Sequence, residues 1–124
     1  MKTQQEPLYR QIAVLVEDML VDGALREGDR APSTNELAAF HAVNPATARK
    51  GLGILVEGRV LHHRRGVGMF VSEGALARVN QRRRGEFASS LVAPLIDEAL
   101  RLTMNRAELH DLVDRVAESR GMYR

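Results

Sequence analysis

Two helix-start signals lie close together in the first half of the chain. In "PSTNE", Ser33 can cap free backbone N–H groups while Glu36, three residues later, reaches back to complete a capping box. In "VNPATARKGLGIL", Asn44 is a good N-cap and Pro45 fits the first helical turn. We therefore expect two short helices, the first ending near His41, that are joined by a tight turn.

The second of these helices carries positive charge at its start, where the helix dipole disfavours cations. Its expected buried stripe consists of Ala48, Leu52, Leu55 and Val56. Thr47, Arg49 and Lys50 point away from that stripe, and a negatively charged partner would explain their position. Two short helices of which the second begins with polar and basic residues have the layout of a helix-turn-helix.

The flanking segments complete a small domain. A first helix is predicted over residues 7–22, where apolar residues recur at helical spacing, namely Leu8, Ile12, Leu15, Met19 and Leu20. The next helix has an apolar ridge of Leu37 and Phe40. After "EGR", the sequence "VLHHRRGVGMFV" predicts two short strands around a glycine-rich tip, which is a β-hairpin. The prediction is a mainly α fold with a small hairpin, a winged helix-turn-helix domain over residues 1–73.

Residues 74–124 are predicted to form a helical dimerisation tail. Pro94 lies inside a helical pattern, so we expect either a kink or a break there. Asn105 with Glu108 signals the start of a last helix, and Gly121 marks its end. The tail has more apolar surface than one wing domain can cover, and a second copy would cover it; packing against the first helix is the alternative for part of this surface. The expected dimer interface contains Phe87, Leu91, Leu95, Leu102, Leu109, Leu112 and Val116.

Charge is unevenly distributed along the 124 residues. Residues 1–43 carry four Lys/Arg and seven Asp/Glu, residues 44–84 carry nine and two, and residues 85–124 carry five and seven. The net charges are therefore −3, +7 and −2. A basic segment between two mildly acidic ones is the electrostatic footprint of a polyanion-binding surface; a solvated basic face without a ligand is the alternative.

Composition excludes several classes of protein. The chain has no cysteine, which excludes disulfides, zinc–thiolate sites and thiol chemistry. No apolar run approaches the roughly 20 residues that span a bilayer, so we expect no membrane segment. "MKTQQEPLYRQ" has no apolar segment after its lysine, so no secretory signal is expected and the cytoplasm is the expected location.

Four motifs in order resemble the GntR family of bacterial transcription regulators, and the short tail with "VNP" resembles its YtrA-type subgroup. The motifs are "PLYRQIA" at 7–13, "GDRAPSTNELA" at 28–38, "VNPATARKGL" at 43–52 and "RRGVGMFV" at 64–71. The resemblance implies a winged helix domain followed by two dimerisation helices, and control of a nearby transporter operon and of the protein's own gene. Larger members carry an effector-binding domain after the wing, for which about 50 residues are too few.

Three positions depart from the family pattern. Asn35 stands where the family often has an arginine that contacts a base, and asparagine suits adenine better than guanine. Pro45 replaces another cation before the recognition helix, and Ala42 replaces the glycine of the turn. DNA sequence preference therefore cannot be transferred from better-known members.

These features predict a DNA-contacting surface. Thr47 can bond a base or a phosphate, Arg49 can grip a guanine or a phosphate, and Lys50 suits a phosphate. An arginine at the hairpin tip can enter a minor groove, while the tip glycines allow a sharp turn and a close approach. The alternatives are a surface ion pair for Arg49 and ordinary hairpin chemistry for the glycines. The predicted contacts are Ser33, Thr34, Asn35, Asn44, Ala46, Thr47, Arg49, Lys50, His63, Arg64, Arg65, Gly66 and Gly68.

No metal site, cofactor or catalytic group is predicted. Neighbouring residues on a strand point to opposite faces, so His62 and His63 cannot easily share one ion. His41 and His110 are isolated in the sequence. Because there is no nucleophile–base pair, no phosphate-cradling loop ahead of a helix and no metal cluster, the chain is not expected to be an enzyme.

The leading hypothesis is a homodimeric repressor that binds a pseudo-palindromic operator in double-stranded DNA, with any small-molecule effector unknown. One alternative is a small-molecule or metal sensor of the same fold, whose site lies between the tail helices; a polar crevice there would favour it. Another is a basic helical adaptor that binds an acidic protein. Salt-dependent DNA binding without sequence preference would leave that adaptor open.

Overall fold

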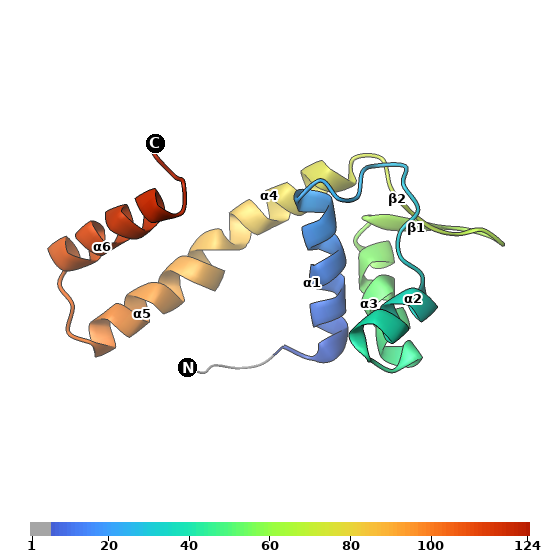
Figure 1. The fold of residues 1–124 in the computed structure, drawn as a ribbon, viewed down its shortest axis with the longest axis horizontal. Helices are drawn as coiled ribbons and strands as arrows, with labels where there is room; N and C mark the ends of the chain where they lie inside the picture. The colour runs from blue at the N-terminus through green and yellow to red at the C-terminus, as the bar shows by residue number, and fades with distance from the viewer. Residues whose placement is uncertain (1–5) are drawn as a thin grey trace. The chain divides into compact units, whose positions relative to one another are not determined.

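The computed structural model describes residues 6–124 and divides the chain into two compact units, one ending at Arg82 and one beginning at Arg83 (Figure 1). The expectation about a secretory signal rests in part on residues 1–5, which lie outside the described residues. The first unit contains α1 (Leu8–Val21), α2 (Thr34–His41), α3 (Pro45–Glu57), β1 (Leu61–Arg64) and β2 (Gly68–Val71). The remaining elements are α4 (Ala75–Phe87), which crosses the boundary, the π-helix η1 (Ala88–Val92), α5 (Ala93–Arg101) and α6 (Arg106–Ser119).

The predicted caps of α2 and α3 are confirmed. The Glu36 backbone N–H donates to Ser33 Oγ at 3.0 Å, and the Ser33 N–H donates to Glu36 Oε1 at 2.8 Å. The hydrogen bond from the Ser33 backbone N–H to the Glu36 carboxylate is the main reason that the pKa of Glu36 lies below its ordinary value, and the Ser33 side chain lowers it further. The Ala46 N–H donates to Asn44 Oδ1 at 2.7 Å, with Pro45 in the first turn of α3. The winged helix-turn-helix fold predicted from the sequence is the fold observed.

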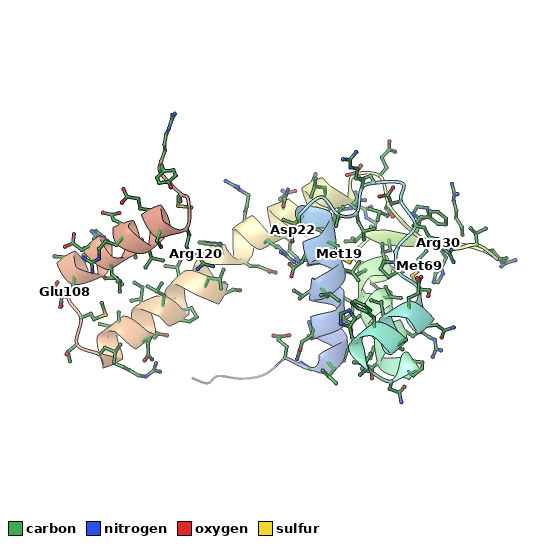
Figure 2. All side chains as sticks on the ribbon, viewed as in Figure 1. Met19, Asp22, Arg30, Met69, Glu108 and Arg120 are labelled. Carbon is green, nitrogen blue, oxygen red and sulfur yellow. The ribbon has the colours of Figure 1, made fainter. Side chains whose placement is uncertain are left out.

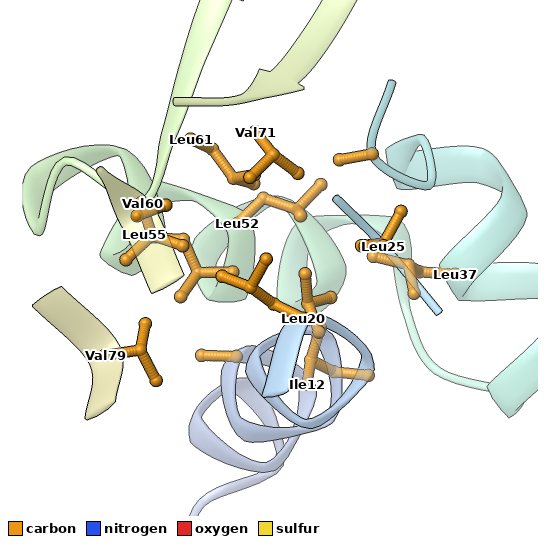
Figure 3. Packing of buried hydrophobic residues seen from close by; sticks show 14 of the residues in the cluster. Ile12, Leu20, Leu25, Leu37, Leu52, Leu55, Val60, Leu61, Val71 and Val79 are labelled. Atoms are coloured by element: carbon orange, nitrogen blue, oxygen red, sulfur yellow. The ribbon is translucent and has the colours of Figure 1, made fainter. Parts of the chain in front are cut away.

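The core of the first unit forms where α1 and α3 pack against each other and against the hairpin (Figure 3). Gly51 permits this close packing, because a Cβ there would lie 2.7 Å from the Tyr9 carbonyl oxygen and 2.9 Å from the Ile12 side chain. Two predicted apolar positions lie outside the core: Leu8 is exposed, and Phe40 is 84% exposed while Leu37 is buried. The largest fully buried side chains are Leu52, Leu55, Leu61, Val16, Val71 and Val79.

A third segment of the chain pairs with the two-stranded hairpin. In the expected antiparallel pair, Leu61 faces Val71 and Arg64 faces Gly68. The loop before α2 adds a third segment, because the Gly28 N–H donates to the Val71 carbonyl at 2.9 Å and the Ala31 N–H donates to the Met69 carbonyl at 2.8 Å. The hairpin of β1 and β2 with its tip is the wing of the fold. Backbone hydrogen bonds thereby connect the start of α2 to the wing.

The first turns of α4 belong to the core of the first unit. Ala75 and Val79 are fully buried, and the Glu27 carboxylate accepts from the Gly74 N–H at 2.9 Å. Glu17 on α1 is only 4% exposed and accepts two hydrogen bonds from the Arg82 guanidinium, at 2.9 and 2.6 Å. Such a bidentate pair compensates for the cost of burying the carboxylate. Arg82, the first of three consecutive arginines, thus has a structural partner.

Pro94 neither breaks nor simply kinks the tail helix. The backbone stays helical from Phe87 to Ala93 and widens into a π turn, in which the Ala93 N–H donates to the Ala88 carbonyl. Proline has no N–H to continue the α-helical pattern, and a π turn is one known way to accommodate that loss. Pro94 then occupies the first turn of α5.

The rest of the second unit consists of two amphipathic helices, α5 and α6, joined by a short turn. The predicted capping box of α6 is confirmed, with the Glu108 N–H donating to Asn105 Oδ1 at 2.8 Å. The connection is closed by the Met104 N–H, which donates to the Ala99 carbonyl at 3.0 Å. Within the described residues, Ala99 is the one hydrophobic residue of this unit that is buried. Most of its larger apolar side chains are therefore exposed.

The turn between α2 and α3 contains a strained residue that can be tested. Ala42 has φ 52° and ψ 42°, in the left-handed region that costs a residue with a Cβ roughly 1–2 kcal/mol. We predict that Ala42→Gly raises the free energy of unfolding by about 0.5–1 kcal/mol, because the relief of strain exceeds the added entropy of the unfolded chain. Urea unfolding followed by circular dichroism measures this, since the chain has no tryptophan for fluorescence.

The matched control is Ala39→Gly, the same substitution at an exposed position inside α2. It should lower the free energy of unfolding by about 1 kcal/mol, because glycine disfavours helix there. If both variants are destabilised to the same extent, Ala42 carries no strain.

Candidate nucleic-acid interface

The start of α3 presents its polar and basic residues away from the core. Ala48, Leu52 and Leu55 are fully buried, whereas Val56 of the predicted stripe is only half-buried. On the other side of the helix Arg49 and Lys50 are exposed. The remaining predicted contacts at this helix start are Asn44 and Ala46, which are exposed, and Thr47, which is half-buried.

The two cations of α3 have different surroundings. Within residues 6–124, the structure gives the Arg49 guanidinium no hydrogen bond or ion pair, so a base or a phosphate could occupy all its donors. The Lys50 Nζ lies 4.1 Å from the centre of the Tyr9 ring, in a cation–π contact with α1. Tyr9 therefore positions the Lys50 side chain, which the sequence pattern did not indicate.

The wing places its basic residues on two faces. His62 and His63 follow strand alternation as expected: His62 Nδ1 lies 2.9 Å from Ser72 Oγ, and His63 pairs with Met69. The Arg64 guanidinium carbon lies 4.6 Å from the centre of the Phe70 ring. At the exposed tip, Gly66 has φ 76°, a conformation that glycine adopts without strain. Arg65 beside it is also exposed.

One cleft joins the start of α2 to the wing. Its volume is about 260 Å³, and it brings Ser33, Thr34 and Asn35 together with His63 and Gly68. The Ser33 Oγ in this cleft accepts the capping hydrogen bond from the Glu36 N–H. The predicted residues at the start of α3 do not line this cleft. The start of α2 lies beside the wing because residues 28–31, which precede α2, pair with β2.

Arg30 lines the same cleft and is absent from the set predicted from the sequence. Figure 2 shows it beside Met69 at the hairpin, where it forms a β-bridge with Phe70. The neighbouring residues in "GDRAPSTNELA" do not distinguish Arg30 from any other exposed arginine in a loop. The signal is the pairing of this loop with β2, which is a contact between distant parts of the sequence.

Among residues 6–124, no set of three or more His, Asp or Glu side chains is arranged to bind an ion. In the same residues no helix combines the length and apolar character needed to cross a membrane.

A helix-turn-helix with a basic, exposed second helix and a basic hairpin defines a winged helix-turn-helix protein. The profile of the family described as "Bacterial regulatory proteins, gntR family" matches residues 8–71, just over half of the chain. The chain belongs to this family, as its motifs indicated.

Individual relatives agree with this assignment. The chain is 33% identical over 69 residues to the HTH-type transcriptional repressor YtrA of Bacillus subtilis strain 168, which is 56% of this chain and 53% of that protein. The structure of this chain is similar to that of a GntR family transcriptional regulator from Listeria monocytogenes. The TM-score is 0.73 and the identity 27%, with coverage of 92% of this chain and 98% of that one.

A DNA-bound structure is also similar in the first unit. AraR(DBD) in complex with operator ORX1 has a TM-score of 0.53 and 29% identity, over 55% of this chain and 82% of that one. The alignments with curated relatives span between 28% and 58% of those proteins' own lengths. The likeness to these relatives therefore concerns mainly the winged helix unit.

Proposed function

We propose that this protein is a sequence-specific DNA-binding repressor that acts as a homodimer on a pseudo-palindromic operator. The observation that carries the proposal is the start of α3, where Arg49 is exposed and unpaired within the described residues while Ala48 and Leu52 are buried behind it. A helix held in this way can enter the major groove with its N-terminal residues toward the base edges. AraR(DBD), which is similar over 55% of this chain and is in complex with an operator, supports operator binding by this chain.

The predicted residues have distinct roles in this proposal. Thr47 and Arg49 read bases, and Lys50, whose ammonium group lies over the Tyr9 ring, contacts a phosphate. The wing residues Arg64 and Arg65 contact the DNA backbone or enter the minor groove. The helix dipole and the cations at the start of α3 both attract phosphate, which explains why positive charge is found at that end. The proposed activity is binding without a chemical reaction, in the cytoplasm, and a transporter operon is the proposed target.

The tail supports a dimer through its exposed apolar side chains. A groove of about 480 Å³ in the second unit is lined by nine apolar residues and Glu98. An apolar surface of this kind is typical of an interface between subunits. Of the predicted interface residues Leu109 is half-buried and the others are exposed, namely Phe87, Leu91, Leu95, Leu102, Leu112 and Val116.

The same groove does not favour the sensor. A polar or ionic effector needs convergent donors and acceptors, and a metal ion needs several ligands. Glu98 supplies the only polar side chain of this lining, and its Oε1 accepts from Arg101 at 2.9 Å. An apolar helix from a second copy matches the groove better than a polar small molecule.

Base reading by Arg49 is tested with Arg49→Ala. We predict about 10- to 100-fold weaker binding to a duplex that the protein has selected from a random pool, and a relaxed preference at one base position. Fluorescence anisotropy measures both, with a scrambled duplex beside the selected one. Lys50→Ala is the matched control, because loss of a phosphate contact should weaken binding to both duplexes by a similar factor.

An equal loss on both duplexes for Arg49→Ala would show that Arg49 contacts a phosphate and reads no base. Strong salt dependence of the wild type with equal affinity for both duplexes would favour the adaptor instead.

The dimer is tested with Leu95→Asp. We predict that the wild type has twice the chain mass of 13.8 kDa and that the variant is monomeric, because an aspartate in an apolar interface is desolvated without a partner. Light scattering gives the mass, and circular dichroism checks that the variant remains helical. Leu8→Asp, at an exposed leucine of α1, is the control and should stay dimeric. A helical Leu95→Asp variant with the wild-type mass would contradict the interface.

A further inference from the structure

We propose that Arg30 and Arg64 together bind one phosphodiester group of the DNA backbone, on either side of Gly68 at the base of the wing. This inference rests on the DNA-binding function proposed above and adds Arg30 to the interface as a positioning residue. It also assigns Gly68 a specific task. The case is made by the pairing of three chain segments, by the space above Gly68 and by the charges around it.

Arg30 is fixed to the wing through its backbone. It forms an antiparallel bridge with Phe70, and the neighbouring Ala31 N–H donates to the Met69 carbonyl at 2.8 Å. Residues directly opposite each other on paired strands point to the same face of a sheet, as do residues two apart on one strand. Arg30, Phe70 and Gly68 therefore share one face of the hairpin.

Arg64 reaches the same face from the other strand. It is the cross-strand partner of Gly68, and its guanidinium carbon lies 4.6 Å from the centre of the Phe70 ring. The ring holds this side chain by a cation–π contact, which reduces the entropy that Arg64 would lose on binding a ligand. Gly68 is thus flanked by one arginine on each side.

The backbone at Gly68 leaves the space that Arg30 occupies. A Cβ at this position would lie 3.0 Å from Arg30 Nε and 3.4 Å from Arg30 Nη2. In addition, Gly68 has φ 141°, which residues with a side chain rarely adopt. A glycine here therefore leaves room for the Arg30 guanidinium to lie over this strand.

The two cations lack a counter-ion of their own. Within residues 6–124, neither the Arg30 nor the Arg64 guanidinium donates a hydrogen bond to a carboxylate. Glu36 interacts electrostatically with Arg30, but its Oε1 accepts the hydrogen bond from the Ser33 N–H. Two arginines close to one glycine repel each other until an anion binds between them, and arginine is well suited to bidentate contact with phosphate.

The anion is a DNA phosphate because of where this pair lies. Arg30 and Gly68 line the cleft that also contains Thr34, Asn35 and His63, which are predicted DNA contacts. A duplex that meets the start of α2 and the wing together would bring a phosphate within reach of Arg30. The phosphate would fix how the wing sits on the duplex, without reading its sequence.

The test is a double-mutant cycle of Arg30→Ala and Arg64→Ala on the full chain. Affinity is measured by anisotropy across a range of salt concentrations, for the selected duplex and for the scrambled one. We expect Arg30→Ala to weaken binding to both duplexes by about tenfold at low salt and to reduce the salt slope by about one. In the double variant, the second substitution should lower the affinity much less than the same substitution does in the wild type, because both arginines hold the same phosphate.

Two further variants make the result specific. Arg26→Ala removes the same charge four residues earlier in the same loop and should change affinity and slope little. Arg30→Lys should keep the salt slope and lose part of the affinity, because lysine lacks the bidentate geometry. Urea unfolding midpoints equal to the wild type would show that the exposed Arg30 side chain is not needed for the fold.

Three outcomes would overturn the inference. If Arg30→Ala changes the affinity and the salt slope no more than Arg26→Ala does, Arg30 is not part of the interface. A loss confined to the selected duplex would make Arg30 a base contact, and fully additive losses would place Arg30 and Arg64 on different phosphates. Failure of the wild type to bind either duplex would be a different result, since it would contradict the proposed function itself.

Discussion

The pairing of residues 28–31 with β2 is the interaction on which the winged helix unit depends. Backbone hydrogen bonds from Gly28 and Ala31 to the wing bring the loop before α2 into the sheet, and Ala31 becomes buried as a result. Because only two residues separate this segment from α2, the capped start of α2 is held close to the hairpin. The left-handed turn at Ala42 then carries the chain from α2 into α3.

A second constraint attaches the tail helix to this unit. The beginning of α4 is capped by the Glu27 carboxylate, and the Arg78 guanidinium donates to the Arg59 carbonyl at 2.8 Å. One turn later the buried Glu17 pairs with Arg82. Removing one partner of a buried pair leaves an uncompensated charge, so this contact favours a single position of the helix on the core. The first two turns of α4 are therefore part of the winged helix unit and lead directly into the segment that carries the proposed dimer surface.

Local features of this fold could be predicted from the sequence, and contacts between distant residues could not. The capping boxes at Ser33 and Asn105 depend on residues three apart, so their sequence signal is complete. Phe40 has the apolar character of a core residue, yet it lies on a face of α2 that nothing in the described chain covers, which periodicity alone does not reveal. The Glu17–Arg82 pair and the bridge of Arg30 to Phe70 join residues far apart in the chain. The DNA contacts and the dimer contacts remain predictions, because each needs a partner that is not part of the chain.

The most direct test of the account is to let the purified protein select duplexes from a random-sequence pool and to sequence those it retains. The account predicts enrichment of one short sequence together with its inverted copy at a fixed spacing, because two recognition helices related by a twofold axis read two half-sites. Retained duplexes with no sequence enriched over the starting pool would contradict sequence-specific recognition. A single enriched half-site without its inverted copy would contradict the dimer.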